Sequence, residues 1–170
     1  MGIRETAQRV AAAKGTTGGN YLHGGRGRAV IRNVSFSDGY KGDKFVAEMR
    51  VLESVDNGAG KADPVGYDFA FLQIFSGTKE KVDTAFNNTK SYLVAANGDT
   101  LEDFNSDPEN DMASLMEAAC GKTQPLRGVL VDYESREVDT KAGKRIVVQT
   151  WRPVKNQTPE AIAENRAKFE

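Results

Sequence analysis

The longest regular pattern of apolar positions lies between Thr78 and Gly98, where residues of one stripe recur at helical spacing. That stripe consists of Val82, Ala85, Phe86, Thr89, Leu93 and Ala96. Thr78 is a suitable N-cap, and Asn97-Gly98 is a suitable left-handed end. The pattern therefore predicts a long helix with one face on the core.

Before this helix, three stretches are typical of strands: 28–36, 44–55 and 65–75. The segment 37–43 between the first two contains two glycines and has the length of a hairpin turn. The third stretch is apolar on both faces, which is expected of a strand that is sandwiched or closed into a barrel.

After the helix, stretches 126–135 and 144–152 flank a polar turn containing Ala142-Gly143 and predict a β-hairpin. Between helix and hairpin, the acidic segment 99–111 reads as a loop. A second short helix is expected from a cap at Asp111 to Gly121.

The two ends of the chain have their own patterns. Residues 3–13 predict a short alanine-rich helix, and the glycine-rich stretch 15–27 predicts an arm or linker. Thr158-Pro159 is a good start for a terminal helix. We expect an N-terminal helix and arm over 1–26, a domain over 27–154 with a helical insert at 77–121, and a helical tail over 155–170.

Five strands with a helix between the third and the fourth is the element order of an OB-fold, a small and partly open barrel. We therefore expect a mainly β protein with helices: a five-stranded OB-like barrel, an N-terminal arm and a C-terminal helix. A β-sandwich is the alternative, because it uses similar strands, although it does not require a helix at that point.

Composition and net charge limit the cellular compartment and the binding partners that we expect for this protein. The 170 residues carry a formal net charge of -1, so any surface that attracts nucleic acid must be local. A single cysteine fits a reducing compartment, and neither a signal peptide nor a membrane span is visible. We expect an intracellular protein of the cytoplasm, or of the host-cell cytoplasm if it is viral, with no membrane partner.

The motifs that suggest catalysis or metal binding are incomplete. Gly121-Lys-Thr resembles a phosphate-binding loop, but the first glycine of that motif is replaced by Met116. The acidic stretch from Asp103 has Pro108 and Ser114 where a calcium loop needs glycine and glutamate. With one histidine and one cysteine, neither a zinc site nor a nucleophile and its base is expected. We expect no enzyme and no cofactor, although catalysis by carboxylates alone stays open.

Basic residues interleaved with aromatic rings form the remaining constellation. An OB-fold binds single strands on the face of strands 2 and 3 and with the 1–2 and 4–5 turns. Rings stack on unpaired bases while cations follow phosphates. The candidates for nucleic-acid binding are Arg32, Tyr40, Lys41, Lys44, Arg50, Tyr67, Phe69, Tyr133, Arg136, Lys141, Lys144, Arg145, Trp151 and Arg152. The competing interpretation is that Phe69 and its neighbours belong to the core.

Two segments carry a resemblance to a known family: GRAVIRNVSFSDGYKGDKFVAEMRVLES and RGVLVDYESREVDTKAGKRIVVQTWRP, with the helix between them. From Gly27 to Val154 the chain resembles phage-encoded single-stranded DNA-binding proteins of the OB type. The resemblance implies a role in DNA replication or recombination. Members commonly end in an acidic tail, whereas this chain ends in AENRAKFE.

The first functional hypothesis is sequence-independent binding of single-stranded DNA, with RNA as the alternative ligand, through stacking and phosphate contacts. The alternative is a structural protein of a virion or another assembly, in which the barrel is a scaffold and the N-terminal arm joins a homo-oligomer. A nuclease accessory or regulatory module is a third option.

Overall fold

The computed structural model describes residues 25–40, 42–56, 62–139, 141–143 and 145–169, and for strand residues 137–138 and 145–148 it describes the backbone only. The described part contains five strands and four helices. They are β1 (Gly25–Ser37), β2 (Asp43–Asp56), β3 (Asp68–Phe75), α2 (Lys79–Ala96), α3 (Leu101–Ser106), α4 (Met112–Ala119), β4 (Leu130–Asp139), β5 (Arg145–Pro153) and α5 (Pro159–Lys168).

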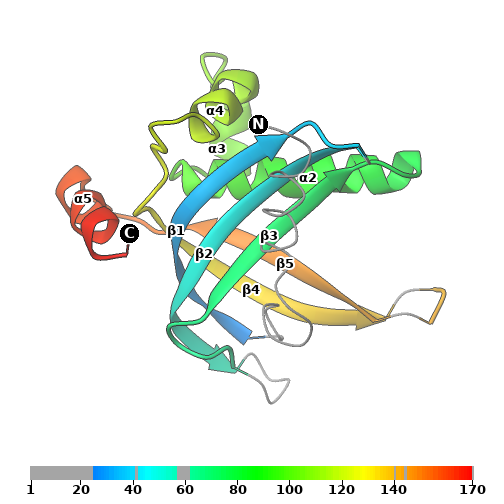
Figure 1. Cartoon of the computed structure of the whole chain (residues 1–170), viewed down its shortest axis with the longest axis horizontal. Helices are drawn as coiled ribbons and strands as arrows, with labels where there is room; N and C mark the ends of the chain where they lie inside the picture. Colours follow the sequence, from blue (N-terminus) through cyan, green and yellow to red (C-terminus); the bar gives the residue numbers. More distant parts are fainter. Residues whose placement is uncertain (1–24, 41, 57–61, 140, 144, 170) are drawn as a thin grey trace.

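The five strands form one antiparallel sheet in the order β3-β2-β1-β4-β5. The sheet curls strongly, so that β1, β2 and β3 cross in front of β4 and β5 (Figure 1). The fold class is therefore mainly β, as expected. Among the described residues, no backbone pairing joins the edge strands β3 and β5, and the sheet is open there.

The inner face of the sheet encloses the core. Residues alternating along each strand are fully buried there, for example Ile31 on β1, Met49 on β2 and Val131 on β4. Two register shifts interrupt the pairing of β1 with β2, between Arg28 and Ala29 and between Ile31 and Asn33. Such bulges increase local twist, which suits a sheet that bends around its own core.

Helix α2 lies across the open side of this core. Its apolar stripe packs against both β3 and β5, so it bridges the two edge strands. Thr78 caps the helix by accepting a hydrogen bond from Lys81 N, and Gly98 follows it with a positive φ. The prediction for 78–98 is confirmed, except that Phe86 is mostly exposed although it lies on the predicted stripe.

Three further helices have local capping signals. α4 begins after Asp111 and α5 begins after Thr158, both as predicted. The expected loop at 99–111 was wrong in part, because Thr100 accepts a hydrogen bond from Asp103 N and caps the short helix α3. None of the described helices has the length and apolar character needed to cross a membrane.

Some boundaries differ from those predicted. β1 begins at Gly25, so residues 25–27 belong to the sheet and not to the arm. β4 begins at Leu130 and not at 126, because residues 125–128 form a turn. The expected N-terminal helix over 3–13 and most of the arm lie outside the described residues.

Candidate nucleic-acid interface

Most of the rings predicted to stack on bases are buried on the inner face of the sheet. Phe69, Tyr133 and Trp151 are core residues, and Trp151 is only 8% exposed. Ring contacts hold them together: the centroids of Phe69 and Tyr133 are 6.0 Å apart, and those of Tyr133 and Trp151 are 6.3 Å apart. Alternation along the strands puts them on the core side, so their assignment to a base-stacking surface was wrong.

Two other predicted rings lie nearer the surface. Tyr67 is half-buried and packs against the core, and its hydroxyl has no hydrogen-bond partner in the described structure. Tyr40, in the β1–β2 turn, is 88% exposed. Of the predicted rings, Tyr40 is therefore the one that is freely available to stack.

The two hairpin turns lie apart in the structure. Figure 1 shows the β1–β2 turn at the upper end of the sheet and the β4–β5 turn at the lower right. Lys44 is half-buried near the first turn, and Arg136 and Lys141 are exposed near the second. Lys41 and Lys144 lie outside the described residues, as does the side chain of Arg145. The structure thus does not bring the two turns together around one channel.

Arg32 and Arg50 converge on one carboxylate on the outer face of the sheet. Arg50 donates from Nε to Asp68 Oδ1 at 2.7 Å and from Nη2 to Oδ2 at 3.0 Å. Arg32 donates from Nη1 to Asp68 Oδ2 at 3.2 Å. The β2–β3 register places Arg50 directly opposite Asp68, and Arg32 is the extra residue of a bulge in β1.

The contacts within this cluster shift the pKa values of its charged groups. The hydrogen bonds from Arg50, and the charge of both arginines, lower the pKa of Asp68 below its ordinary value, against the opposing effect of burial. The same pair raises the pKa of Arg50. Asp68 and Arg50 are therefore charged at neutral pH, and the hydrogen bonds hold both guanidinium groups against the Asp68 carboxylate.

A second set of charges crosses the outer face nearer the start of β1. Arg28 donates to both oxygens of Asp132, at 2.8 and 3.2 Å, and Arg152 donates from Nη2 to Glu134 at 3.0 Å. The strand pairings set Glu53, Arg28, Asp132 and Arg152 side by side on β2, β1, β4 and β5. Opposite charges alternate along this row, which stabilises the register.

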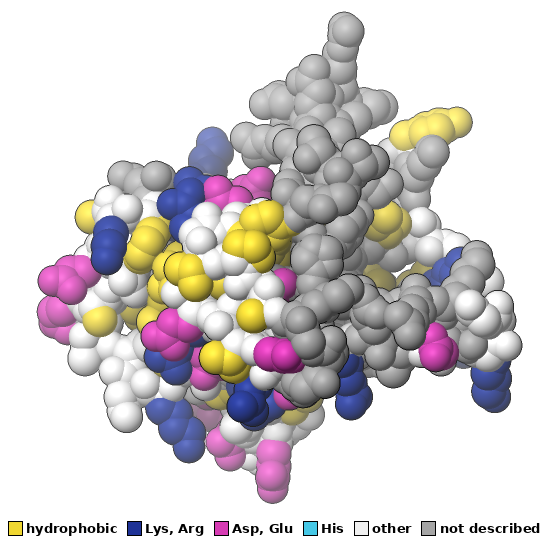
Figure 2. Space-filling view, turned by 90° about the horizontal axis from the view of Figure 1, so that it is seen from below, with side chains coloured by type: hydrophobic (Ala, Val, Ile, Leu, Met, Phe, Trp, Pro, Cys, Tyr) yellow, Lys and Arg dark blue, Asp and Glu magenta, His cyan; other side chains and the backbone are white. Residues whose placement is uncertain are grey.

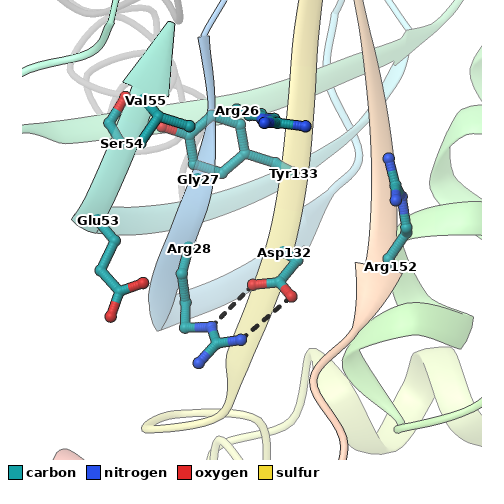
Figure 3. Close-up of a pocket in the computed structure, with 9 residues that line it drawn as sticks. All are labelled: Arg26, Gly27, Arg28, Glu53, Ser54, Val55, Asp132, Tyr133 and Arg152. Carbon is teal, nitrogen blue, oxygen red and sulfur yellow. Dashed lines mark hydrogen bonds and ion pairs between the residues drawn. The ribbon is translucent and has the colours of Figure 1, made fainter. Parts of the chain in front are cut away.

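This row borders a shallow pocket of about 290 Å³ (Figure 3). Three arginines from two strands line it: Arg26 and Arg28 from β1, and Arg152 from β5. The Arg26 side chain is exposed and makes no hydrogen bond or ion pair with another described residue. Figure 3 shows the Arg28–Asp132 pair below Arg26, with Arg152 on the neighbouring strand.

Gly27 forms part of the pocket wall because the backbones of β1 and β2 approach closely there. The register shift of β2 at Leu52 turns the Glu53 carbonyl toward β1. A Cβ at position 27 would overlap that carbonyl oxygen, so only glycine fits. The close approach of the two backbones therefore leaves no room for a side chain at position 27.

Positive charge does not dominate the surface. Figure 2 shows Lys and Arg side chains separated by Asp and Glu over the visible part of one face. Each arginine has five N–H donors, however, and its hydrogen bonds to described carboxylates use one or two of them. The outer face thus offers oriented donors rather than a strong positive field.

The structure shows one aromatic cluster that sequence reasoning missed. Phe36, Phe75 and Phe86 form a row, with centroid distances of 6.4 Å between the first two and 4.8 Å between the last two. Phe36 is 39% exposed and Phe86 is 55% exposed. The sequence pattern places one of these apolar residues at the end of β1 and the other on the stripe of α2. Only the tertiary packing shows that the core does not cover them.

Sites for metal ions or nucleophilic catalysis do not emerge from the described residues. No group of three or more ligating side chains converges in that part of the chain. Burial raises the pKa of the Cys120 thiol to about 11, which makes it a poor nucleophile at neutral pH. Comparisons with protein-family models, with curated proteins and with solved structures gave no match.

Proposed function

We propose that the protein binds single-stranded nucleic acid, with single-stranded DNA in replication or recombination as the favoured ligand. The observation that supports this most is the strand order β3-β2-β1-β4-β5 combined with α2 between β3 and β4. That arrangement is expected of an OB-type sheet whose β3 and β5 edges remain apart. Such folds bind oligonucleotides on the β2–β3 face and the adjoining turns.

The outer face of β2 and β3 has the chemistry that this role needs. Arg50 and Arg32 stand at one end with unused N–H donors for phosphate, and Lys44 stands at the other end. Between them, Leu72 and Ile74 provide partly exposed apolar surface for bases. Tyr40 follows β1 and can stack on a base, a contact that contributes about 1–3 kcal/mol.

Single strands fit this surface better than a duplex does. A protein with a net charge of -1 gains little from the general attraction of duplex phosphates. Affinity must then come from contacts to exposed bases, which only an unpaired strand presents. The expected binding is moderate in strength and weakens as salt increases.

The test is fluorescence anisotropy of a labelled oligothymidine at several salt concentrations. Tyr40→Ala and Arg50→Ala should weaken binding, and Arg50→Ala should reduce the salt slope by about 0.7, the value for one lost phosphate contact on a single strand. Lys122→Ala, an exposed lysine after α4, is the matched control. Wild-type affinity that is equal for duplex and single strand, or that ignores salt, would contradict the proposal.

A second candidate function is self-assembly, and the row Phe36–Phe75–Phe86, whose first and last rings are exposed, favours it. The row adjoins β3, whose outer edge has no strand partner among the described residues. Two identical edges can pair antiparallel around a twofold axis, so the occupant would be a second copy of this chain. Light scattering should then show a dimer that Phe86→Ser dissociates. A monomer at all concentrations rules this candidate out.

A further inference from the structure

We infer that the pocket lined by Arg26, Arg28 and Arg152 is a phosphate site that holds one phosphodiester of the bound strand. This inference rests on the proposed function and extends it to β1, β4 and β5, away from the β2–β3 face. Arg26 and Arg28 fell outside the predicted interface, and Arg152 was assigned to it without a partner.

The donors in the pocket are oriented but incompletely used. Arg28 donates from Nε and Nη2 to Asp132, which leaves its Nη1 group without a hydrogen bond to a described residue. Arg152 gives only Nη2 to Glu134, and its side chain is largely exposed. Arg26 lies opposite Glu134 in the β1–β4 register and has no ion-pair partner among the described residues. A tetrahedral oxyanion can accept from donors on several sides, which these groups provide.

The carboxylates in the pocket determine how strong the site can be. Glu53 and Asp132 line the pocket, and Glu134 pairs with Arg152 beside it, so three carboxylates oppose the three arginines. Asp132 accepts two hydrogen bonds from Arg28 and orients it. The Glu134 carboxylate accepts a single hydrogen bond, from an exposed arginine, so an incoming phosphate displaces it more easily than Asp132. Phosphate therefore competes with Glu134 for Arg152.

Gly27 and Ser54 line the pocket between the arginines, and the Glu53 carbonyl oxygen fills the space that a side chain at position 27 would need. A phosphate in the pocket would lie over β1 between residues of β2 and β4. That position is reached by a strand that leaves the β2–β3 face near Arg50 and crosses β1.

Inorganic phosphate is the first probe, because it tests the pocket without a nucleic acid. In an NMR titration of the full chain, the amides of Gly27 and Ser54 should shift in a saturable manner. Arg26→Ala and Arg152→Ala should each weaken phosphate binding about tenfold, the effect of losing one charge-assisted hydrogen bond. Glu134→Gln should tighten it severalfold, a gain that a merely destabilised variant would not give.

Two controls make the outcome specific. Lys122→Ala removes an exposed lysine far along the chain and should leave phosphate binding unchanged. Sodium chloride at matched ionic strength should not reproduce the shifts. If chloride reproduces them, or if Glu134→Gln has no effect while the arginine variants bind as well as wild type, the pocket is not a phosphate site.

The same variants separate this inference from the proposed function. With oligothymidine, Arg152→Ala should lower the salt slope by about 0.7, in addition to the effect of Arg50→Ala. If oligothymidine binds and the slope is unchanged by Arg152→Ala, the pocket inference fails and the proposed function stands. If phosphate binds and oligothymidine does not, the proposed function fails and the anion pocket remains.

Discussion

The Gln124 side chain replaces a neighbouring strand as the hydrogen-bond partner of one residue of β1. β4 pairs with β1 only from Arg26 to Val30, so the following residues of β1 need other partners. The Gln124 side chain accepts from Val34 N at 2.7 Å and donates to Val34 O at 2.8 Å. Both backbone groups are buried, and leaving them unpaired is costly.

We expect Gln124→Ala to lower the free energy of unfolding by about 2–4 kcal/mol, because two buried backbone groups lose their partner. Urea unfolding followed by circular dichroism measures this change. Thr123→Ala, at the exposed neighbouring position, is the control and should stay within about 0.5 kcal/mol of wild type. An equal loss in both variants would assign the effect to the turn and not to the amide.

Tyr92 is the largest fully buried side chain, and its hydroxyl has no partner among the described residues. Burial raises the pKa of the Tyr92 phenol above its ordinary value near 10.0. The unfolded chain therefore ionises at a lower pH than the folded chain. This contribution to stability is complete below pH 10 and is lost as the pH rises beyond it.

Tyr92→Phe should leave stability at pH 7 unchanged or raise it by up to about 1 kcal/mol, because it removes a buried unpaired hydroxyl. It should also shift alkaline unfolding to higher pH. Circular dichroism as a function of pH measures the midpoint, with Tyr40→Phe as the exposed control. A variant less stable than wild type at pH 7 would mean that the hydroxyl has a partner.

At the scale of elements, α5 is the helix held by polar contacts rather than by an apolar stripe. It contains no buried residue. Arg166 donates to the carbonyls of Gln124 and Thr123 at 3.0 and 2.6 Å, and Asn165 donates to Gly128 O at 3.1 Å. Gly128 permits this close approach, because a Cβ there would overlap the Ile162 carbonyl. These bonds fasten α5 to the segment that precedes β4.

Arg166→Ala should loosen α5 selectively, since it removes the charged donor of two backbone hydrogen bonds. We expect a loss of about 1–2 kcal/mol in the free energy that opens this helix, seen as faster amide exchange in 159–168. Glu164→Ala, an exposed change on the same helix, is the control. Exchange that accelerates equally in β1 and β2 would show that α5 does not open separately.

At the scale of the whole molecule, side chains join the two layers where backbone pairing stops. Phe71 on β3 and Trp151 on β5 have centroids 5.1 Å apart, and Tyr92 of α2 is 5.0 Å from Trp151. These contacts span the open edge between β3 and β5. The single tryptophan therefore lies at the point where both layers and the helix meet.

Trp151 should thus report global unfolding and not ligand binding. We expect blue-shifted emission in the folded protein, a red shift that coincides with the loss of circular dichroism in urea, and little change on addition of oligothymidine. Quenching by acrylamide measures the same burial independently. Strong quenching by the oligonucleotide would place the strand at the β3–β5 edge and contradict the proposed surface.

Helices with capping residues and strands with alternating apolar residues could be predicted from the sequence, because these signals lie within the element or next to it. Three helices are capped through hydrogen bonds to residues two or three positions ahead, and the caps are Thr78, Asp111 and Thr158. Each cap can therefore be recognised within a short stretch of sequence. Helix α3 was not predicted, because its six residues are mostly polar and carry no apolar stripe. The strands were recognisable from alternation, while their ends depended on bulges and on partners elsewhere in the chain.

By itself, the sequence determined the order of the five strands and of α2, α4 and α5, together with the apolar stripe of α2, since each depends on residues close together in the chain. Tertiary structure alone decided that Phe69, Tyr133 and Trp151 face inward and that Asp68 binds Arg50. It also decided that Arg28 meets Asp132, a residue 104 positions away. Such pairings depend on strand register and sheet curvature, which long-range packing sets and no short window contains.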